Sequence, residues 1–348
     1  MNRFHCRCGQ PIFFDSTGCV SCGAVLGFDK ETQQLLPLDF ESDGTLVTDT
    51  GQRFRLCRNG TELNACNWLI PSPSQESYCW ACRFNRTIPD QSRPRNNERL
   101  RRFESAKKRL FYTLIRLGLP LTNGFDDPED GLLLDFIEDQ RSDPERFPES
   151  FVQTGFHGGV ITINTLEADD DARETVRIQL NELYRTLLGH LRHESGHFYW
   201  SILDPNEGMS GRFRTVFGDP DQDYGEALGR YYENGPVFDW RDNFISAYAS
   251  AHPNEDWAES WAHYLLIYDA LETAASHGMV ATAPDYLGIE ERVAEWRLLS
   301  VALNELNRSS GLRDAYPFVL NDRVAAKFRF IHEIVSLLGR RTRASAGC

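Results

Sequence analysis

The chain has 348 residues, of which 41% are hydrophobic, so it can bury a sizeable core and is long enough for two or three domains. Its net charge is -14, with the acidic excess after residue 99, which argues against nucleic acid or an anionic membrane as the main partner. No run of about 18 apolar residues indicates a transmembrane helix, and the N-terminus has no apolar signal-peptide core. We therefore expect a cytoplasmic protein that binds neither nucleic acid nor membrane.

Nine cysteines are present, and all but Cys348 lie within the first 82 residues. Without a secretion signal, this clustering favours metal ligation over disulfides. The first set contains two close pairs, Cys6-x-Cys8 and Cys19-x-x-Cys22. A glycine follows each pair, and glycine lets backbone amides turn toward the sulfurs of a tetrahedral thiolate site. Short strands are expected at 11–14 and 24–28.

The second set contains Cys57, Cys66, Cys79 and Cys82, after a strand-like segment at 52–56. Two sets of four predict two closed structural zinc sites. Interleaving of ligands between the sets stays open at this point. An electron-transfer iron site of rubredoxin type is the rival, and Cys6-x-Cys8 departs from its usual pair of C-x-x-C knuckles.

The next segments mix a linker, a helix and short strands. Polar residues and prolines at 85–97 predict a linker, which places a first domain at 1–92 and a second at 93–348. Apolar residues at three- and four-residue spacing predict a helix over 98–117. Its basic cluster, Arg101-Arg102 and Lys107-Lys108-Arg109, is expected on a solvated face. One short helix or strand is expected near 132–136, and a short strand at 156–164.

The longest helical pattern runs from Asp171 to about Leu203 and contains His193-Glu194-x-x-His197. Residues four apart lie on one face of a helix, so His193 and His197 can hold one zinc ion. Glu194 then lies within reach of a zinc-bound water, which it can activate as general base. Gly196 inside the helix indicates that another element, or the metal, comes close. A further helical segment is expected at 224–234.

A catalytic zinc site also needs a third protein ligand. Pro253 begins a new helix that carries Glu255 and Glu259 on the same face, one turn apart. One carboxylate can bind the metal while the other holds a ligand histidine by its free ring nitrogen, which is the gluzincin arrangement. The spacing alone leaves both glutamates open, with His252 and His263 as alternative donors. Later helices are expected at about 263–276, 288–306 and 321–338, with core residues between 296 and 303.

The segment 248–259 resembles the active-site segment of the lethal-factor-like metallopeptidases, in which a tyrosine stands seven residues before the ligand glutamate and a second glutamate four after it. Those positions here are Tyr248, Glu255 and Glu259. The resemblance implies that Glu255 is the zinc ligand, that Glu259 orients a ligand histidine, and that Tyr248 donates a hydrogen bond to the oxyanion.

The whole chain is similar to a bacterial family of zinc-binding metallopeptidases that carry an N-terminal zinc-ribbon domain. The likeness rests on the cysteine pairs and on residues 85–90, 193–197 and 252–259. It implies an α+β protein in which a small double zinc-ribbon domain precedes a mainly helical, zincin-like domain with a short sheet.

We therefore predict a zinc metallopeptidase with one catalytic and two structural zinc ions, acting on a peptide or protein substrate. The zinc-ribbon domain is structural and can also recruit a protein partner. Two alternatives stay open, a catalytically silent zinc-ribbon adaptor and a zinc amidohydrolase that acts on a non-protein amide. Glu194 and Tyr248 are both present, which favours an enzyme over the adaptor.

Overall fold

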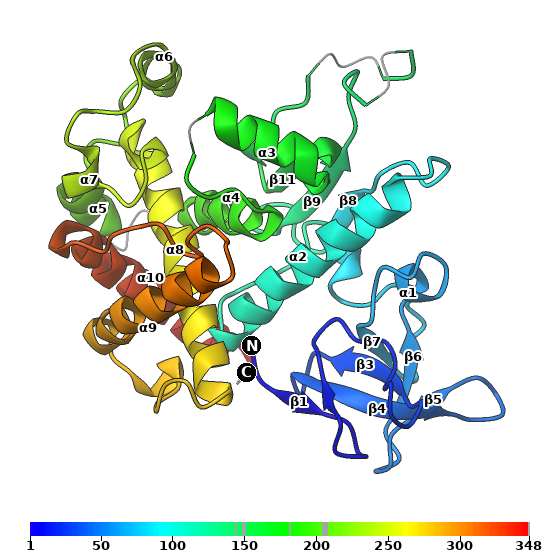
Figure 1. Cartoon of the computed structure of the whole chain (residues 1–348). Helices are drawn as coiled ribbons and strands as arrows, with labels where there is room; N and C mark the ends of the chain where they lie inside the picture. The colour runs from blue at the N-terminus through cyan, green and yellow to red at the C-terminus, as the bar shows by residue number, and fades with distance from the viewer. Residues whose placement is uncertain (143–144, 148–150, 181, 204–207, 347–348) are drawn as a thin grey trace. The chain divides into compact units, whose positions relative to one another are not determined.

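A computed structural model describes residues 1–142, 145–147, 151–180, 182–203 and 208–346 (Figure 1). The chain forms two compact units. One joins Met1–Tyr112 with Thr122–Asp170, and the other joins Thr113–Leu121 with Asp171–Cys348. Within the described ranges, no helix combines the length and the apolar character that a membrane span requires.

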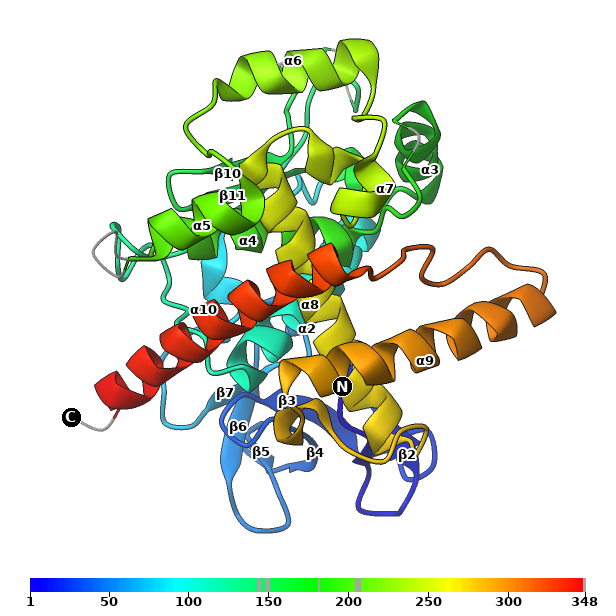
Figure 2. The ribbon, with the colours of Figure 1, turned by 90° about the vertical axis from the view of Figure 1, so that its left-hand side faces the viewer.

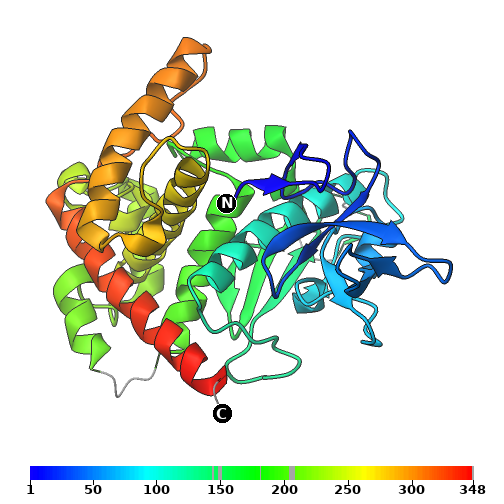
Figure 3. The same cartoon turned by 90° about the horizontal axis from the view of Figure 1, so that it is seen from below.

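The first unit contains a five-stranded antiparallel sheet (Figure 3). In spatial order its strands are β3 Val25–Asp29, β4 Gln34–Phe40, β5 Leu46–Val47, β6 Arg53–Leu56 and β7 Leu69–Pro71. Alternate apolar residues pack on one face, and Leu38, Leu46, Phe54 and Leu69 form its buried core. The strands expected near 24–28 and 52–56 are thus confirmed.

The same unit contains further short elements, with most of the cysteines in the loops beside them. These elements are the paired strands β1 Phe4–His5 and β2 Pro11–Ile12, the helix α1 Arg58–Thr61 and the 3-10 helix η1 Cys82–Phe84. An aromatic cluster fills the space beside them, with the ring of Phe28 at 5.0 Å from Phe14 and 4.8 Å from Trp68.

A second sheet of the same unit has the order β10-β11-β9-β8. Its strands are β8 Asn85–Thr87, β9 Leu133–Ile137, β10 Gly155–His157 and β11 Val160–Asn164. Of the short helix or strand expected near 132–136, the structure has the strand. The linker expected at 85–97 is wrong at its start, because 85–87 pairs with β9. The single strand expected at 156–164 is a hairpin, because Gly158 and Gly159 both have positive φ and reverse the chain.

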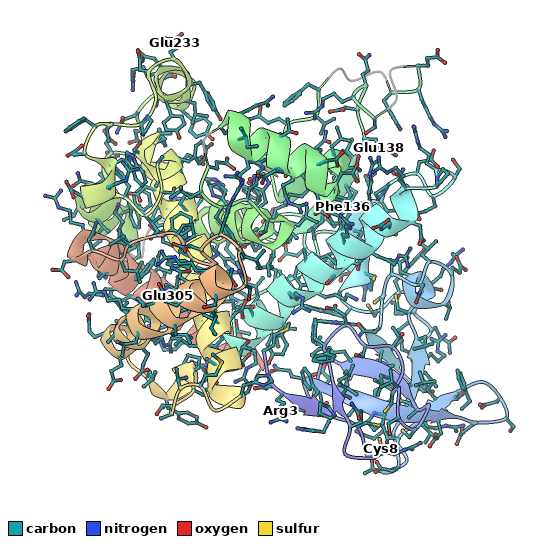
Figure 4. The ribbon with its side chains drawn as sticks, in the orientation of Figure 1. Arg3, Cys8, Phe136, Glu138, Glu233 and Glu305 are labelled. Atoms are coloured by element: carbon teal, nitrogen blue, oxygen red, sulfur yellow. The ribbon has the colours of Figure 1, made fainter. Side chains whose placement is uncertain are left out.

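Helix α2, Asn96–Arg116, confirms the helix expected over 98–117, and the division between the two units falls within it, after Tyr112. Leu100, Phe103 and Leu110 are fully buried. Phe103 stacks on Phe136 of β9, which Figure 4 labels, with 4.5 Å between ring centroids. The predicted apolar stripe is therefore buried, and Phe103 packs on the second sheet.

The basic cluster of α2 is only partly on a solvated face, because Arg101 is exposed but Lys107 and Lys108 are buried. Lys107 donates to Glu104 and to Asn85 Oδ1, both at 2.7 Å, while Lys108 donates to Asn67 Oδ1 at 3.2 Å. A buried ammonium group is stable only when it is paired and hydrogen-bonded. The periodicity of the helix does not reveal the two asparagine partners, because they lie outside it in the sequence.

The second unit is helical (Figure 2). Its helices, the first of which begins one residue before the unit, are α3 Asp170–Gln179, α4 Leu187–Ser201, α5 Met209–Phe217, α6 Tyr224–Asn234, α7 Trp240–Asn243, α8 Pro253–Ser276, α9 Ile289–Ser309 and α10 Asp322–Ala346. Besides η1, the described residues include the 3-10 helices η2 Thr165–Ala168 of the first unit, and η4 Tyr248–Ser250 and η5 Pro284–Tyr286 of the second.

The long helix expected from Asp171 to Leu203 is two helices, α3 and α4. Helix α4 starts afresh because the Thr186 hydroxyl accepts a hydrogen bond from Gly189 N and caps it. Leu180 and Leu183 lie in the break and are exposed, so they do not join a continuous apolar stripe. The helix expected from about 263 is the second half of α8. In α9, Trp296 and Leu299 are buried as expected, but Leu298 and Val301 are exposed.

Helices α4 and α8 pack closely against each other. The indole of Trp257 donates to Gly196 O at 2.8 Å, and that of Trp261 donates to Ser195 Oγ at 3.1 Å. A Cβ at Gly196 would lie 3.1 Å from the Ala258 backbone. The expected close approach at Gly196 is therefore present, and the approaching element is α8.

Candidate metal centres

The first four cysteines converge in the first unit, with their sulfurs within 4.8 Å of one another. Cys6 Sγ lies 3.5 Å from Cys22 Sγ, and Cys8 Sγ lies 3.7 Å from Cys19 Sγ. Figure 4 marks Cys8 at the edge of this cluster. The backbone amide of Cys22 lowers the pKa of the Cys19 thiol to about 6, which favours the thiolate that a metal requires.

The amide geometry near these sulfurs depends on the two glycines noted in the sequence. Gly9 and Gly23 have φ values of 84° and 75°, and their amides donate to Cys6 O and Cys19 O, both at 2.9 Å. These left-handed turns suit glycine and close each knuckle.

The second four cysteines form a separate, fully buried cluster. The sulfurs of Cys57, Cys66, Cys79 and Cys82 also lie within 4.8 Å of one another, with 3.6 Å between Cys66 and Cys79. The two sets are not interleaved, which resolves the alternative left open by the sequence. Burial raises the pKa of the Cys79 thiol, so a cation beside this sulfur would favour its thiolate form. Both donor sets fit tetrahedral thiolate sites, and Cys348 lies outside the described residues.

In the second unit, α4 and α8 bring together His193, His197 and Glu255. His193 Nε2 lies 3.1 Å from Glu255 Oε2 and 3.3 Å from His197 Nε2. His197 Nε2 lies 3.5 Å from Glu255 Oε1. The two imidazoles are one helical turn apart, and the carboxylate comes from the first turn of α8. Two imidazoles and one carboxylate are a donor set that suits zinc with one position left open.

The electrostatics of this trio favour a bound cation. Burial alone lowers the pKa of His193, but its hydrogen bonds with Glu255 and Glu259 raise it above the ordinary value. Burial lowers the pKa of His197. Burial tends to raise the pKa of Glu255, yet the hydrogen bond and charge of His193 hold it at about 2. The buried carboxylate thus stays ionised beside the positive charge of His193, and a divalent ion could take the place of that charge.

Glu259 lies one turn further along α8 and contacts the other nitrogen of His193. His193 Nδ1 lies 2.7 Å from Glu259 Oε1, and the hydroxyl of Ser246 donates to Glu259 Oε2 at 2.5 Å. Ser246 Oγ also accepts from Ala249 N at 3.1 Å. The spacing had left either glutamate as the third ligand. In the structure Glu255 lies beside the Nε2 atoms of both His193 and His197, whereas Glu259 contacts Nδ1 of His193.

The alternative donors are placed elsewhere. His252 caps α8, since its Nδ1 accepts from Asn254 N at 3.1 Å. The ring of His263 is buried against Phe318, and its Nδ1 lies 2.9 Å from the Tyr316 hydroxyl. Both histidines are accounted for by contacts within the core of the second unit.

Glu194 and Tyr248 lie near the trio without joining it. Glu194 is buried, and its carboxylate makes no hydrogen bond or ion pair with another described residue. The ring of Tyr248 lies 6.0 Å from that of His193, and burial raises the pKa of its hydroxyl well above the ordinary value. Tyr248 is therefore protonated at neutral pH and can donate a hydrogen bond.

Sequence reasoning missed Tyr224, the first residue of α6. Its hydroxyl donates to Glu255 Oε1 at 2.8 Å. Burial and the nearby Glu255 charge raise the pKa of this tyrosine. The only signal in the sequence was a helical segment at 224–234 after a connection rich in Gly, Pro and Asp, which indicates nothing about Glu255. Ser246 was also missed, because nothing in the sequence around it indicates its hydrogen bond with Glu259.

Comparison with known proteins agrees with this arrangement. A family model described as "Putative zinc-binding metallo-peptidase" matches residues 96–334, and a model described as "zinc-ribbon domain" matches residues 3–93. The chain belongs to that metallopeptidase family. Zinc binding and an N-terminal zinc ribbon are thus properties of the family and the fold. The boundary expected after residue 92 stays a prediction.

Relatives with the same architecture occur in mycobacteria. Uncharacterized proteins of Mycobacterium bovis and of two strains of Mycobacterium tuberculosis are 39% identical over 344 residues, covering 96% of this chain and 95% of each relative. No solved structure gave a significant match.

Proposed function

We propose that the chain is a zinc-dependent hydrolase of peptide bonds, with one catalytic and two structural zinc ions. The observation that carries the proposal is the convergence of His193, His197 and Glu255, with Glu259 on the free nitrogen of His193. Structural zinc sites usually close their coordination with four protein ligands, whereas three ligands are typical of hydrolases. The roles of these residues follow the gluzincin pattern.

His193, His197 and Glu255 would hold the catalytic zinc. Zinc in such a site lowers the pKa of a coordinated water and polarises the substrate carbonyl. Glu259 keeps the His193 ring in the orientation that presents Nε2 to the metal, because Nδ1–H donates to its carboxylate. The two cysteine sets would hold structural zinc and stabilise the first unit, which can also recruit a protein partner.

Glu194 is the proposed general base and acid. Its carboxylate has no competing hydrogen bond among the described residues, so it is available to take a proton from the attacking water. The same group then delivers that proton to the leaving amine. Tyr248 donates a hydrogen bond from its protonated hydroxyl to the carbonyl oxygen as negative charge develops there.

The test compares wild type with Glu194→Gln on a library of peptides from a whole proteome, with new termini counted by mass spectrometry. Wild type should cleave, and the variant should lose about 100-fold or more in rate while its zinc content is unchanged. Glu233→Gln, an exposed acid on α6 (Figure 4), is the matched control and should cleave like wild type.

Full activity in Glu194→Gln would refute the mechanism. Absence of cleavage in wild type and variant alike would favour the adaptor reading. A second arm with small non-protein amides distinguishes a peptidase from an amidohydrolase, since the latter would turn over these amides and leave the peptides intact.

A further inference from the structure

The starts of α6 and α8 are held together at two points. The Tyr224 hydroxyl donates to Glu255 Oε1 at 2.8 Å, and its ring lies edge-on to His252 at 5.1 Å. His252 Nδ1 accepts from Asn254 N, so its Nε2 carries the hydrogen and lies 3.3 Å from Gln222 O as a donor. Tyr224 therefore reaches a candidate zinc ligand from an element outside the His-bearing helix.

Helix α6 makes little other buried contact that would hold its first residue beside Glu255. Ala227 is its one buried residue, and Tyr224 itself is 45% exposed although its hydroxyl is hydrogen-bonded. A half-exposed tyrosine contributes modestly to a core. Its ordered contact is instead with a carboxylate that is 1% exposed and carries charge. Charge-assisted hydrogen bonds of this kind are stronger than neutral ones and fix geometry.

We propose that Tyr224 is a positioning residue that fixes the Glu255 carboxylate for zinc. The carboxylate of a glutamate can rotate about its terminal torsion, and a hydrogen-bond donor on one of its oxygens limits that rotation. Glu259 orients His193 and Tyr224 orients Glu255, so two of the three ligands have a dedicated partner. This assignment rests on the proposed zinc site, and it adds a residue from α6 to its support.

The role differs from that of an oxyanion donor. An oxyanion donor acts on the transition state and leaves zinc affinity unchanged, whereas a positioning residue acts on the metal whether or not substrate is present. Tyr224 contacts Glu255 directly, while Tyr248 makes no such hydrogen bond among the described residues. Zinc affinity therefore separates the two tyrosines.

The experiment is a zinc titration of Tyr224→Phe in the full chain. Phenylalanine keeps the ring contact with His252 and removes only the hydroxyl. Zinc at the third site is defined as the zinc that His193→Ala loses, and its affinity is measured by competition with a chelator. We expect about 10-fold weaker zinc binding at that site and an unchanged circular dichroism spectrum. Tyr232→Phe, on the same helix and 57% exposed, is the control and should bind zinc like wild type.

Each outcome bears on the proposal. Unchanged zinc affinity with a lower kcat would make Tyr224 an oxyanion donor and overturn the positioning role. Unchanged affinity and unchanged kcat would overturn it as well. The titration needs no substrate, so it stays readable even if the peptides are not cleaved. A failure of peptide hydrolysis and a failure of this assignment are therefore distinguishable.

Discussion

The two ring nitrogens of His193 contact two different carboxylates. Nε2 lies 3.1 Å from Glu255 and Nδ1 lies 2.7 Å from Glu259. One nitrogen is thereby presented to a metal while the other fixes the tautomer and the ring orientation. Two of the proposed zinc ligands each have a hydrogen-bond partner of their own: Glu259 contacts His193, and Tyr224 contacts Glu255.

Glu259→Gln should weaken zinc binding at the third site by about 10-fold, because the amide keeps an oxygen near His193 Nδ1 but loses the negative charge that makes the ring a better ligand. Zinc competition on the purified variant measures this. Ser246→Ala, which removes the hydrogen bond behind Glu259, should have a smaller effect in the same direction. Wild-type affinity in Glu259→Gln would show that the carboxylate does not support the ligand.

The sequence predicted the ligands better than their supports. His193, Glu194 and His197 are recognisable because catalysis needs them at fixed helical spacing, and Glu255 and Glu259 share a second helix face. Tyr224 has no such spacing to any of them. Its hydrogen bond with Glu255 joins α6 to α8, and this contact depends on tertiary packing that the local sequence around Tyr224 does not indicate.

At the scale of elements, the site depends on the close crossing of α4 and α8. Gly196 permits it, since a Cβ there would lie 3.1 Å from Ala258 Cα and 3.2 Å from the Trp261 side chain. The bond from Trp257 to Gly196 O fixes the same contact. The three proposed ligands come from both helices, so the distance between α4 and α8 determines how closely Glu255 approaches the two histidines.

Gly196→Ala should destabilise the protein by about 1–2 kcal/mol, because overpacking costs more than the roughly 1 kcal/mol that alanine gains in a helix. It should also weaken zinc binding, since α4 and α8 must move apart. Urea unfolding and zinc competition measure both effects. Gly211→Ala, in α5 with open space around it, should be neutral or stabilising by up to about 1 kcal/mol. A Gly196→Ala variant as stable as wild type would mean that the crossing tolerates a methyl group.

Elements were predicted well where a local pattern decides the structure. The stripe of α2 and the proline start of α8 gave correct helices, because burial of one face and a preset φ act locally. The single helix expected over 171–203 was wrong, because the Thr186 cap competes with continued apolar spacing. The burial of Lys107 was not predictable from its own helix, because Asn85, which accepts one of its two hydrogen bonds, lies outside that helix.

At the scale of the molecule, the chain separates two kinds of candidate metal site. The first unit holds two four-cysteine sets, a donor number that would fill a tetrahedron, and the second holds a trio, which would leave one position of a tetrahedral zinc open. The first four cysteines of the sequence form one cluster and the next four form the other, a division that the spacing alone could not decide. The strand 85–87 of the second sheet was missed because a three-residue strand leaves no clear alternation.

The zinc content of the purified chain tests the central claim, that the His193, His197 and Glu255 trio is a zinc site distinct from the two cysteine sets. Wild type should contain about three zinc ions per chain, and His193→Ala about two. His277→Ala, at the exposed end of α8, should match wild type. A content of about two in both wild type and His193→Ala would contradict the account.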